Sequence, residues 1–228
     1  HRYSFWNTCT DPKLKRGYAG TAVLTATRPA SVTFGFSDDE APEIEGRVIT
    51  LRFKDVAVIC SYTPSARVDG PRYQHRLDFD RRLANHARAV RTEMPVFMCG
   101  DFNVAHTDQD CPDDADIPLE LKGFSRSPQE RAGFDAIITA AKAQDSHPVQ
   151  ANGKHQFSWF KEPTGVSQRA GLGMRLDMIL IPIEFTTISF NIVHNTTCSD
   201  HRPVVVVAHN NNANNQRHTK ALLSQALV

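Results

Sequence analysis

The chain has 228 residues, of which 40% are hydrophobic and 22% are charged, and its formal net charge is +1 at pH 7. This composition excludes a disordered or fibrous chain, and the length suffices for one large domain with a sizeable core. The small net charge excludes a uniformly basic surface, so a nucleic-acid partner would need locally clustered Lys and Arg.

Five cysteines are scattered along the chain, and no two have Cys-x-x-Cys spacing. Cys60 and Cys99 lie in apolar, strand-like runs, which is typical of reduced core residues. No apolar run has transmembrane length, and no signal peptide is recognisable. We therefore expect an intracellular protein without a membrane partner.

The first half of the chain predicts strands and one helix. The opening stretch HRYSFWN is aromatic and strand-like, and because it begins with His1 we expect a fragment or a processed product. Apolar residues recur at helical spacing from Tyr73 to Val90. Lys54-Asp55 separates two strands at the spacing of a hairpin. Strands are expected over residues 19–27, 47–53, 56–62 and from Val96 onward.

The second half predicts one more helix and several strands. Ser127-Pro128 with Glu130 forms a capping box that begins this helix. Residues 209–228 include an Asn-rich, low-complexity stretch, so we expect a disordered tail after a domain of residues 1–208. The pattern predicts an α/β fold with largely antiparallel sheets, stacked and covered by helices. Strands are expected over residues 155–160, 175–181, 186–193 and 203–208.

Polar side chains stand where several strands begin or end. Asp101 and Asn103 flank one aromatic residue, so in extended backbone both would point to the same side. For such a pair taken alone, an ordinary turn is the more common explanation, since Gly, Asp and Asn favour turns. Because strand ends on one rim of a sheet converge, recurrence of the pattern favours a polar site. The residues concerned are Tyr62, Asp101, Asn103, Asp177, Asp200 and His201.

These residue types suit one chemistry best. Carboxylate and amide oxygens without thiolates are ligands for Mg²⁺ or Mn²⁺ rather than for structural zinc. Such ions act on phosphate esters, and a histidine beside a carboxylate stays oriented and protonated to donate to a phosphate oxygen. No Ser or Cys lies in a recognisable nucleophile elbow, so the expected nucleophile is water.

At this point a resemblance is visible. GDFNVAH, RLDMIL and SDHRPV resemble, in order and spacing, motifs of the endonuclease/exonuclease/phosphatase superfamily. RGYAGTAVLT, EGRVITL, YTP and FSWF narrow the resemblance to exonuclease III-type abasic-site (AP) endonucleases, over about Tyr3 to Val207. It implies a four-layer α/β sandwich with two mixed, largely antiparallel sheets flanked by helices. It also implies a repair enzyme, nuclear if eukaryotic, that uses Mg²⁺ or Mn²⁺ to cut double-stranded DNA 5′ to abasic sites.

The resemblance assigns catalytic roles to five residues. Asp101 matches the aspartate that orients or deprotonates the attacking water, and Asn103 matches its neighbour that contacts phosphate and water. His201 matches the phosphate-binding histidine, with Asp177 as its partner. Tyr62 matches the tyrosine that contacts the scissile phosphate.

The resemblance also implies a metal site and a pocket for the abasic sugar. Asp200 matches a metal-site aspartate, which Asp101 and Asn103 would assist. Trp159 falls at an aromatic wall of the pocket, with Phe157 as the second candidate. Met174 stands where the family has tryptophan, and Arg175 flanks the pocket loop.

Three further departures from the family pattern bear on whether the chain is active. Ser65 and Gly171 replace family asparagines, and nothing in the chain matches the segment that carries the family's metal-ligand glutamate. We expect a monomer, or a domain completed by an additional N-terminal segment, with 3′-end processing as a further activity. The alternatives are another phosphodiesterase or phosphatase of the superfamily, or a catalytically incomplete fragment that binds DNA or a protein partner.

Overall fold

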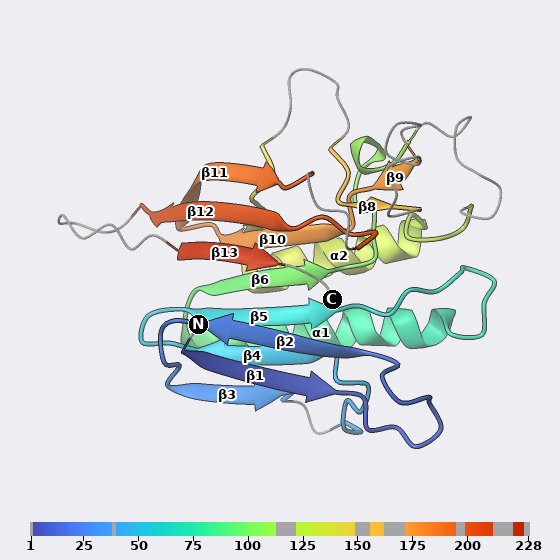
Figure 1. Cartoon of the computed structure of the whole chain (residues 1–228), viewed down its shortest axis with the longest axis horizontal. Coiled ribbons are helices and arrows are strands. Elements are labelled where there is room, and N and C mark those ends of the chain that lie inside the picture. Colours follow the sequence, from blue (N-terminus) through green and yellow to red (C-terminus); the bar gives the residue numbers. More distant parts are fainter. Residues whose placement is uncertain are drawn as a thin grey trace.

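The computed structural model of the chain describes residues 2–37, 40–112, 122–148, 156–161, 172–194, 199–211 and 221–225. Its centre is a six-stranded mixed sheet with the strand order β3-β4-β5-β6-β10-β7 (Figure 1). Only β5 and β6 run parallel, and the other neighbours are antiparallel. The strands are β3 (Ser31–Phe34), β4 (Val48–Arg52), β5 (Ala57–Tyr62), β6 (Val96–Asp101), β7 (Ala143–Asp145) and β10 (Asp177–Pro182).

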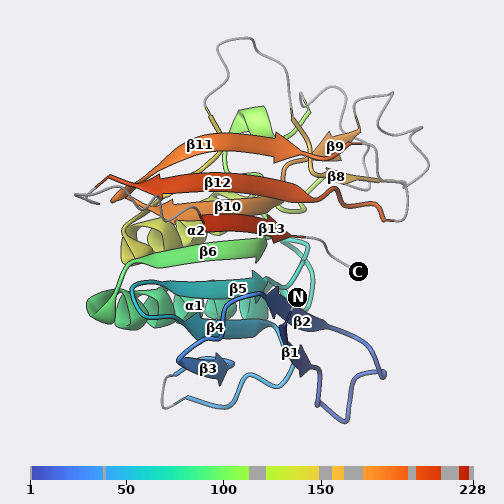
Figure 2. The same ribbon diagram turned by 60° about the vertical axis from the view of Figure 1, so that its left-hand side comes forward.

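Two long helices, α1 (Tyr73–Glu93) and α2 (Pro128–Ala141), cover one face of this sheet (Figure 2). Met98 of β6 and Leu180 of β10 belong to a buried cluster with Leu83 of α1 and Phe134 of α2. The expected capping box begins α2, since Ser127 Oγ accepts from the Glu130 amide and Glu130 accepts from the Ser127 amide. One 3₁₀ turn, η1 (Asp108–Asp110), follows β6.

The opposite face of the sheet packs against a second, antiparallel sheet, in which β12 (Val204–Asn210) lies between β11 (Phe185–Ile192) and β13 (Ala221–Gln225). Phe97 and Ile179 contact Phe185 and Val204 there, as expected because side chains alternate across a strand. A hairpin of β1 (Tyr3–Thr8) and β2 (Gly20–Thr25) and a short ladder of β8 (Trp159–Phe160) and β9 (Gly173–Met174) complete the described strands.

The α/β class, the two helices and the β4–β5 hairpin predicted from sequence are confirmed. Within the described ranges, helices cover one sheet face only, so three layers of the expected four are present (Figure 2). The prediction of a disordered tail is wrong for Ala221–Gln225, because this segment forms β13 against the edge of β12. Residues 212–220 lie outside the described chain. None of the described helices is long and apolar enough to cross a membrane.

Candidate active site

Three neighbouring strands bring Tyr62, Asp101 and Asp177 together at one edge of the sheet. The Cα of Asp101 is paired with Tyr62 across the parallel β5–β6 ladder and with Asp177 across the antiparallel β6–β10 ladder. Gly100 permits this approach, because a Cβ there would lie 1.7 Å from the carbonyl oxygen of Ser61. Paired residues of adjacent strands point to the same face, so all three side chains project on the side of β11 and β12.

The chain turns immediately after Asp101, so the turn and the polar site coexist. Asp101 Oδ1 accepts from the Asn103 amide at 2.8 Å, and Oδ2 accepts from Asn103 Nδ2 at 2.9 Å. Asn103 adopts φ 46°, a left-handed conformation that Asn tolerates better than most residues. The side chains therefore meet through a turn closed by a carboxylate, and not through the extended backbone expected from sequence.

His201 reaches the same edge from the segment before β12. Its Nδ1 lies 2.8 Å from Asp177 Oδ2, and the Asp177 carboxylate is only 2% exposed, so water screens this interaction little. Burial disfavours a charged ring, but the hydrogen bond and charge of Asp177 outweigh it and raise the pKa of His201 to about 9. The imidazole is therefore a cation at neutral pH, with Nδ1 held by the carboxylate.

The carboxyl group of Asp101 is in an unusual electrostatic environment. Burial, followed by the negative charge of Asp177, raises its pKa to about 7, although His201 opposes this shift. Burial and the charge of Asp101 also raise the pKa of Tyr62, so its phenol stays a proton donor. A carboxyl with a pKa near 7 is matched to proton transfer at neutral pH.

The expected pocket aromatic lies beside this group. Trp159 packs with Met174 and Leu176, and its Nε1–H donates to Asp200 Oδ2 at 3.0 Å. The Phe160 amide donates to the Asp200 carbonyl, which fixes the loop before His201 against β8. The structure thus brings the predicted pocket residues Trp159 and Met174 next to the predicted metal-site aspartate.

Two pocket assignments differ from the sequence-based expectation. Arg175 is buried, and its guanidinium is bound by Asp110 at 2.6 Å and Asp145 at 2.7 Å, so it is an internal ion pair and not a DNA contact. Phe157 is buried and packs edge-on against Phe160, which makes it a core aromatic. Ser65 is exposed, and Gly171 lies outside the described residues.

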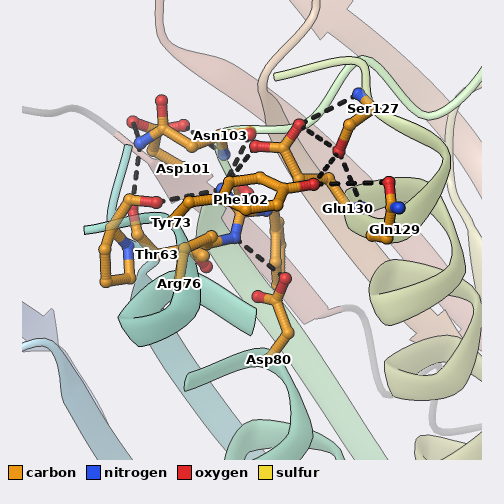
Figure 3. Close-up of polar contacts among 11 residues, drawn as sticks. Thr63, Tyr73, Arg76, Asp80, Asp101, Phe102, Asn103, Ser127, Gln129 and Glu130 are labelled. Carbon is orange, nitrogen blue, oxygen red and sulfur yellow. Dashed lines mark hydrogen bonds and ion pairs between the residues drawn. The ribbon is translucent and has the colours of Figure 1, made fainter. Parts of the chain in front are cut away.

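Two buried arginines lie next to the site; Arg47 was not singled out from sequence, and Arg76 was considered only as a phosphate contact near the tyrosine loop, a role that its burial opposes. Arg47 lies 4.6 Å from the Tyr62 ring centroid and donates to the Tyr62 carbonyl. Arg76 donates to the carbonyls of Phe102 and Asn103 (Figure 3). A sequence signal did exist for Arg76, because it lies on the buried stripe of α1 together with Leu83.

The described residues do not by themselves make a metal site. No group of three or more His, Cys, Asp or Glu side chains within the described ranges is arranged to hold an ion. Asp101, Asp177 and Asp200 supply the hard oxygens that Mg²⁺ prefers. However, both Asp101 oxygens accept from Asn103, and Asp200 accepts from Trp159.

Comparisons with known proteins identify the family to which the chain belongs. A model described as "Endonuclease/Exonuclease/phosphatase family" matches residues 1–201. An exodeoxyribonuclease of Bacillus subtilis (strain 168) is 31% identical over 209 residues, which cover 89% of this chain and 78% of that protein. A DNA-(apurinic or apyrimidinic site) endonuclease of Dictyostelium discoideum is 29% identical over 201 residues, or 85% of this chain and 54% of that protein.

Solved structures show the same fold. The 3′ phosphatase NExo from Neisseria, bound to a product DNA hairpin, superposes with a TM-score of 0.72 at 23% identity. The match covers 90% of this chain and 78% of the other. The arrangement of strands and helices is therefore shared with a solved enzyme of low sequence identity.

Proposed function

Because the chain belongs to the endonuclease/exonuclease/phosphatase family, we propose that it hydrolyses phosphodiester bonds of double-stranded DNA on the 5′ side of abasic sites. The observation that carries the proposal is the row of Asp101, Asp177 and His201 across adjacent elements. It places a carboxyl with a pKa near 7 beside an imidazolium, and this pair suits water attack on a phosphodiester.

In the proposed reaction Asp101 orients the attacking water and accepts its proton. As the new P–O bond forms, the P–O3′ bond breaks, and the 3′-oxygen leaves as the hydroxyl of the upstream strand after taking a proton from solvent. Each Asp101 oxygen accepts one hydrogen bond from Asn103 and retains a lone pair for water. His201 donates from Nε2 to a non-bridging phosphate oxygen, where negative charge accumulates in the transition state. Tyr62 donates from its phenol to the same phosphate. Asp177 keeps the imidazole charged and correctly turned.

We propose Mg²⁺ or Mn²⁺ as the cofactor, supported by the family membership and by the oxygen donors at the site. Since the described residues do not complete a metal site, an ion would need further ligands beyond Asp101, Asn103 and Asp200. The alternative is a protein that binds abasic DNA without cutting it. A bound ion would neutralise negative charge on the phosphate and polarise its P–O bond, which is why we expect cleavage to require it.

Metal removal tests this cofactor. We expect cleavage of a duplex that carries one abasic site to require Mg²⁺ or Mn²⁺ and to stop when a chelator is in excess. The measurement is the cleaved fraction of an end-labelled strand, with the same duplex lacking the lesion as control. Full activity in excess chelator would reject the cofactor. Binding of the abasic duplex without cleavage under any divalent ion would favour the alternative.

We propose that the abasic sugar is bound against the partly buried ring of Trp159, which packs over the buried side chains of Met174 and Leu176. An abasic nucleotide has no base to unstack, so turning it out of the helix costs less than turning out an intact nucleotide. A compact apolar pocket then excludes normal bases. The thioether of Met174 is more adaptable than an indole. This supports tolerance of altered 3′ termini as a second activity of the same site.

Substitutions at Trp159 test the pocket. We expect Trp159→Ala to lower the ratio of abasic to undamaged cleavage, whereas Trp159→Phe retains the aromatic wall and loses only the donor to Asp200. Met174→Trp should shift activity from 3′-blocked ends towards internal abasic sites. Cleavage of the three duplexes is compared for each variant. If Trp159→Ala leaves the ratio unchanged, the residue is core packing and the pocket assignment fails.

A further inference from the structure

Arg76 is a fully buried arginine in the first turn of α1. It is 1% exposed, and it lies on the helix stripe that buries Asp80 and Leu83. A guanidinium remains charged in proteins, so a buried one requires several fixed acceptors around it. The identity of these acceptors decides what the residue does.

Three of the acceptors are backbone carbonyls of the two strand exits that form the site. Nη1 donates to the carbonyls of Pro64 and Asn103 at 3.0 and 2.9 Å, and Nη2 donates to that of Phe102 at 2.9 Å (Figure 3). Pro64 follows Tyr62 at the end of β5, whereas Phe102 and Asn103 follow Asp101 at the end of β6. One planar group therefore ties both exits together.

The turn at Asn103 depends on such ties. Its backbone is left-handed, at φ 46°, and its side chain donates both to Asp101 Oδ2 and to the Thr63 carbonyl. A non-glycine residue keeps this conformation only where the surroundings determine it. Arg76 holds the Asn103 carbonyl, and so it stabilises the conformation in which the Asn103 amide and side chain reach Asp101.

Carboxylates of α1 and α2 also contact the Arg76 guanidinium and help to fix its position. Nε donates to Asp80 Oδ2 at 2.8 Å, and Glu130 Oε1 lies 3.7 Å from Nη1. Glu130 is in turn held by Ser127, whose hydroxyl lies 2.6 Å from the Tyr73 hydroxyl (Figure 3). A lysine could carry the charge, but it lacks the rigid fork that reaches three carbonyls at once.

We propose that Arg76 is a positioning residue of the reaction, which sets the backbone at Asn103 and thereby the orientation of the Asp101 carboxyl towards water. The catalytic part of this inference rests on the proposed function. The structural part does not depend on activity, because it states that the turn after β6 loses its ordered conformation when the guanidinium is absent.

The test compares Arg76→Lys and Arg76→Ala with Arg91→Met. Arg91 is a matched control, since it is a largely buried arginine at the other end of α1 that pairs with Glu184 far from the site. The first readout is amide hydrogen exchange over residues 101–105 and 63–66. We expect faster exchange there in both Arg76 variants and unchanged exchange in the Arg91 variant.

The second readout is kinetic. We expect kcat to fall about 10–100-fold in Arg76→Lys with KM little changed, since misplaced reacting groups cost rate more than binding. Methylguanidinium should restore part of kcat to Arg76→Ala, whereas methylammonium should not. If Arg76→Ala does not fold, the test rests on Arg76→Lys. Its exchange and kcat are then compared with those of Arg91→Met at temperatures equally far below the melting temperature of each variant.

Unchanged exchange over residues 101–105 in Arg76→Lys would overturn the proposal, as would a kcat loss no greater than that of Arg91→Met. If the unaltered protein cuts none of the DNA substrates, the proposed function fails. The exchange comparison then still decides whether Arg76 holds the turn. The two failures are therefore distinguishable.

Discussion

Replacing Asp101 with asparagine is expected to lower kcat for abasic-site cleavage by about 10²–10⁴-fold, the usual contribution of a general base. The free energy of unfolding of this variant should not fall along with kcat. Burial raises the pKa of the Asp101 carboxyl to about 7, which means that the charged form is disfavoured in the folded protein. Because its folded pKa is raised, folding favours the protonated group, and this contribution is lost as pH rises from about 4 through about 7. A neutral amide avoids this loss, which offsets the loss of one of the two acceptors that Asp101 presents to Asn103.

The measurement pairs single-turnover cleavage with thermal unfolding at pH 8. Asp78→Asn serves as the control, because Asp78 is a half-exposed carboxylate on α1 that pairs with Arg81 away from the site. We expect the control to leave kcat unchanged. A fall in melting temperature of Asp101→Asn that accounts for the lost activity would contradict a chemical role for the carboxyl.

Replacing Asp177 with asparagine is expected to act through His201. Without the carboxylate, the pKa of His201 should fall from about 9 towards its ordinary value of 6.5. At pH 8 the charged fraction of the ring then drops roughly 30-fold, and kcat should fall by at least that factor. The loss should shrink as the pH is lowered through 6.5, so the alkaline limb of the pH–rate profile moves to lower pH.

The same substitution should cost about 1.5–3 kcal/mol of stability, the usual contribution of a hydrogen bond to a charged group. Because the folded pKa of His201 is raised, the stabilisation is complete below about pH 6.5 and is lost as pH rises through about 9. The ring-proton NMR titration of His201 reports the pKa directly. Asp135→Asn is the control, since Asp135 lies 2.7 Å from His106 in a separate, exposed pair. An unshifted His201 titration in Asp177→Asn would reject the pairing.

Much of this site could be predicted from sequence because its residues lie at strand ends. Asp101, Asp177 and His201 each adjoin an apolar run whose strand assignment was clear, and paired strands bring such ends to one rim. The α/β class followed from the same runs. The short strands β3, β7 and β9 were not predicted, because two to four residues carry too little periodicity to identify a strand.

The remaining errors concern long-range partners. Arg175 next to a pocket loop suggests a DNA contact, and only the fold shows that Asp110 and Asp145 enclose it. The role of Arg76 depends on carbonyl groups, which a sequence pattern does not reveal. Ala221–Gln225 follows an Asn-rich stretch, and its strand exists because the edge of β12 offers free hydrogen-bonding groups.

The proposed site directs water to the phosphorus on the 5′ side of an abasic nucleotide. The most direct test is cleavage of a duplex with one natural abasic site in heavy-oxygen water, with Mg²⁺ present and the products analysed by mass spectrometry. We expect a 3′-hydroxyl on the upstream fragment and one heavy oxygen in the 5′-phosphate of the downstream fragment, and Asp101→Asn should form both products at least about 100-fold more slowly. An unsaturated aldehyde at the 3′ end without the label, or no cut at the lesion, would contradict it.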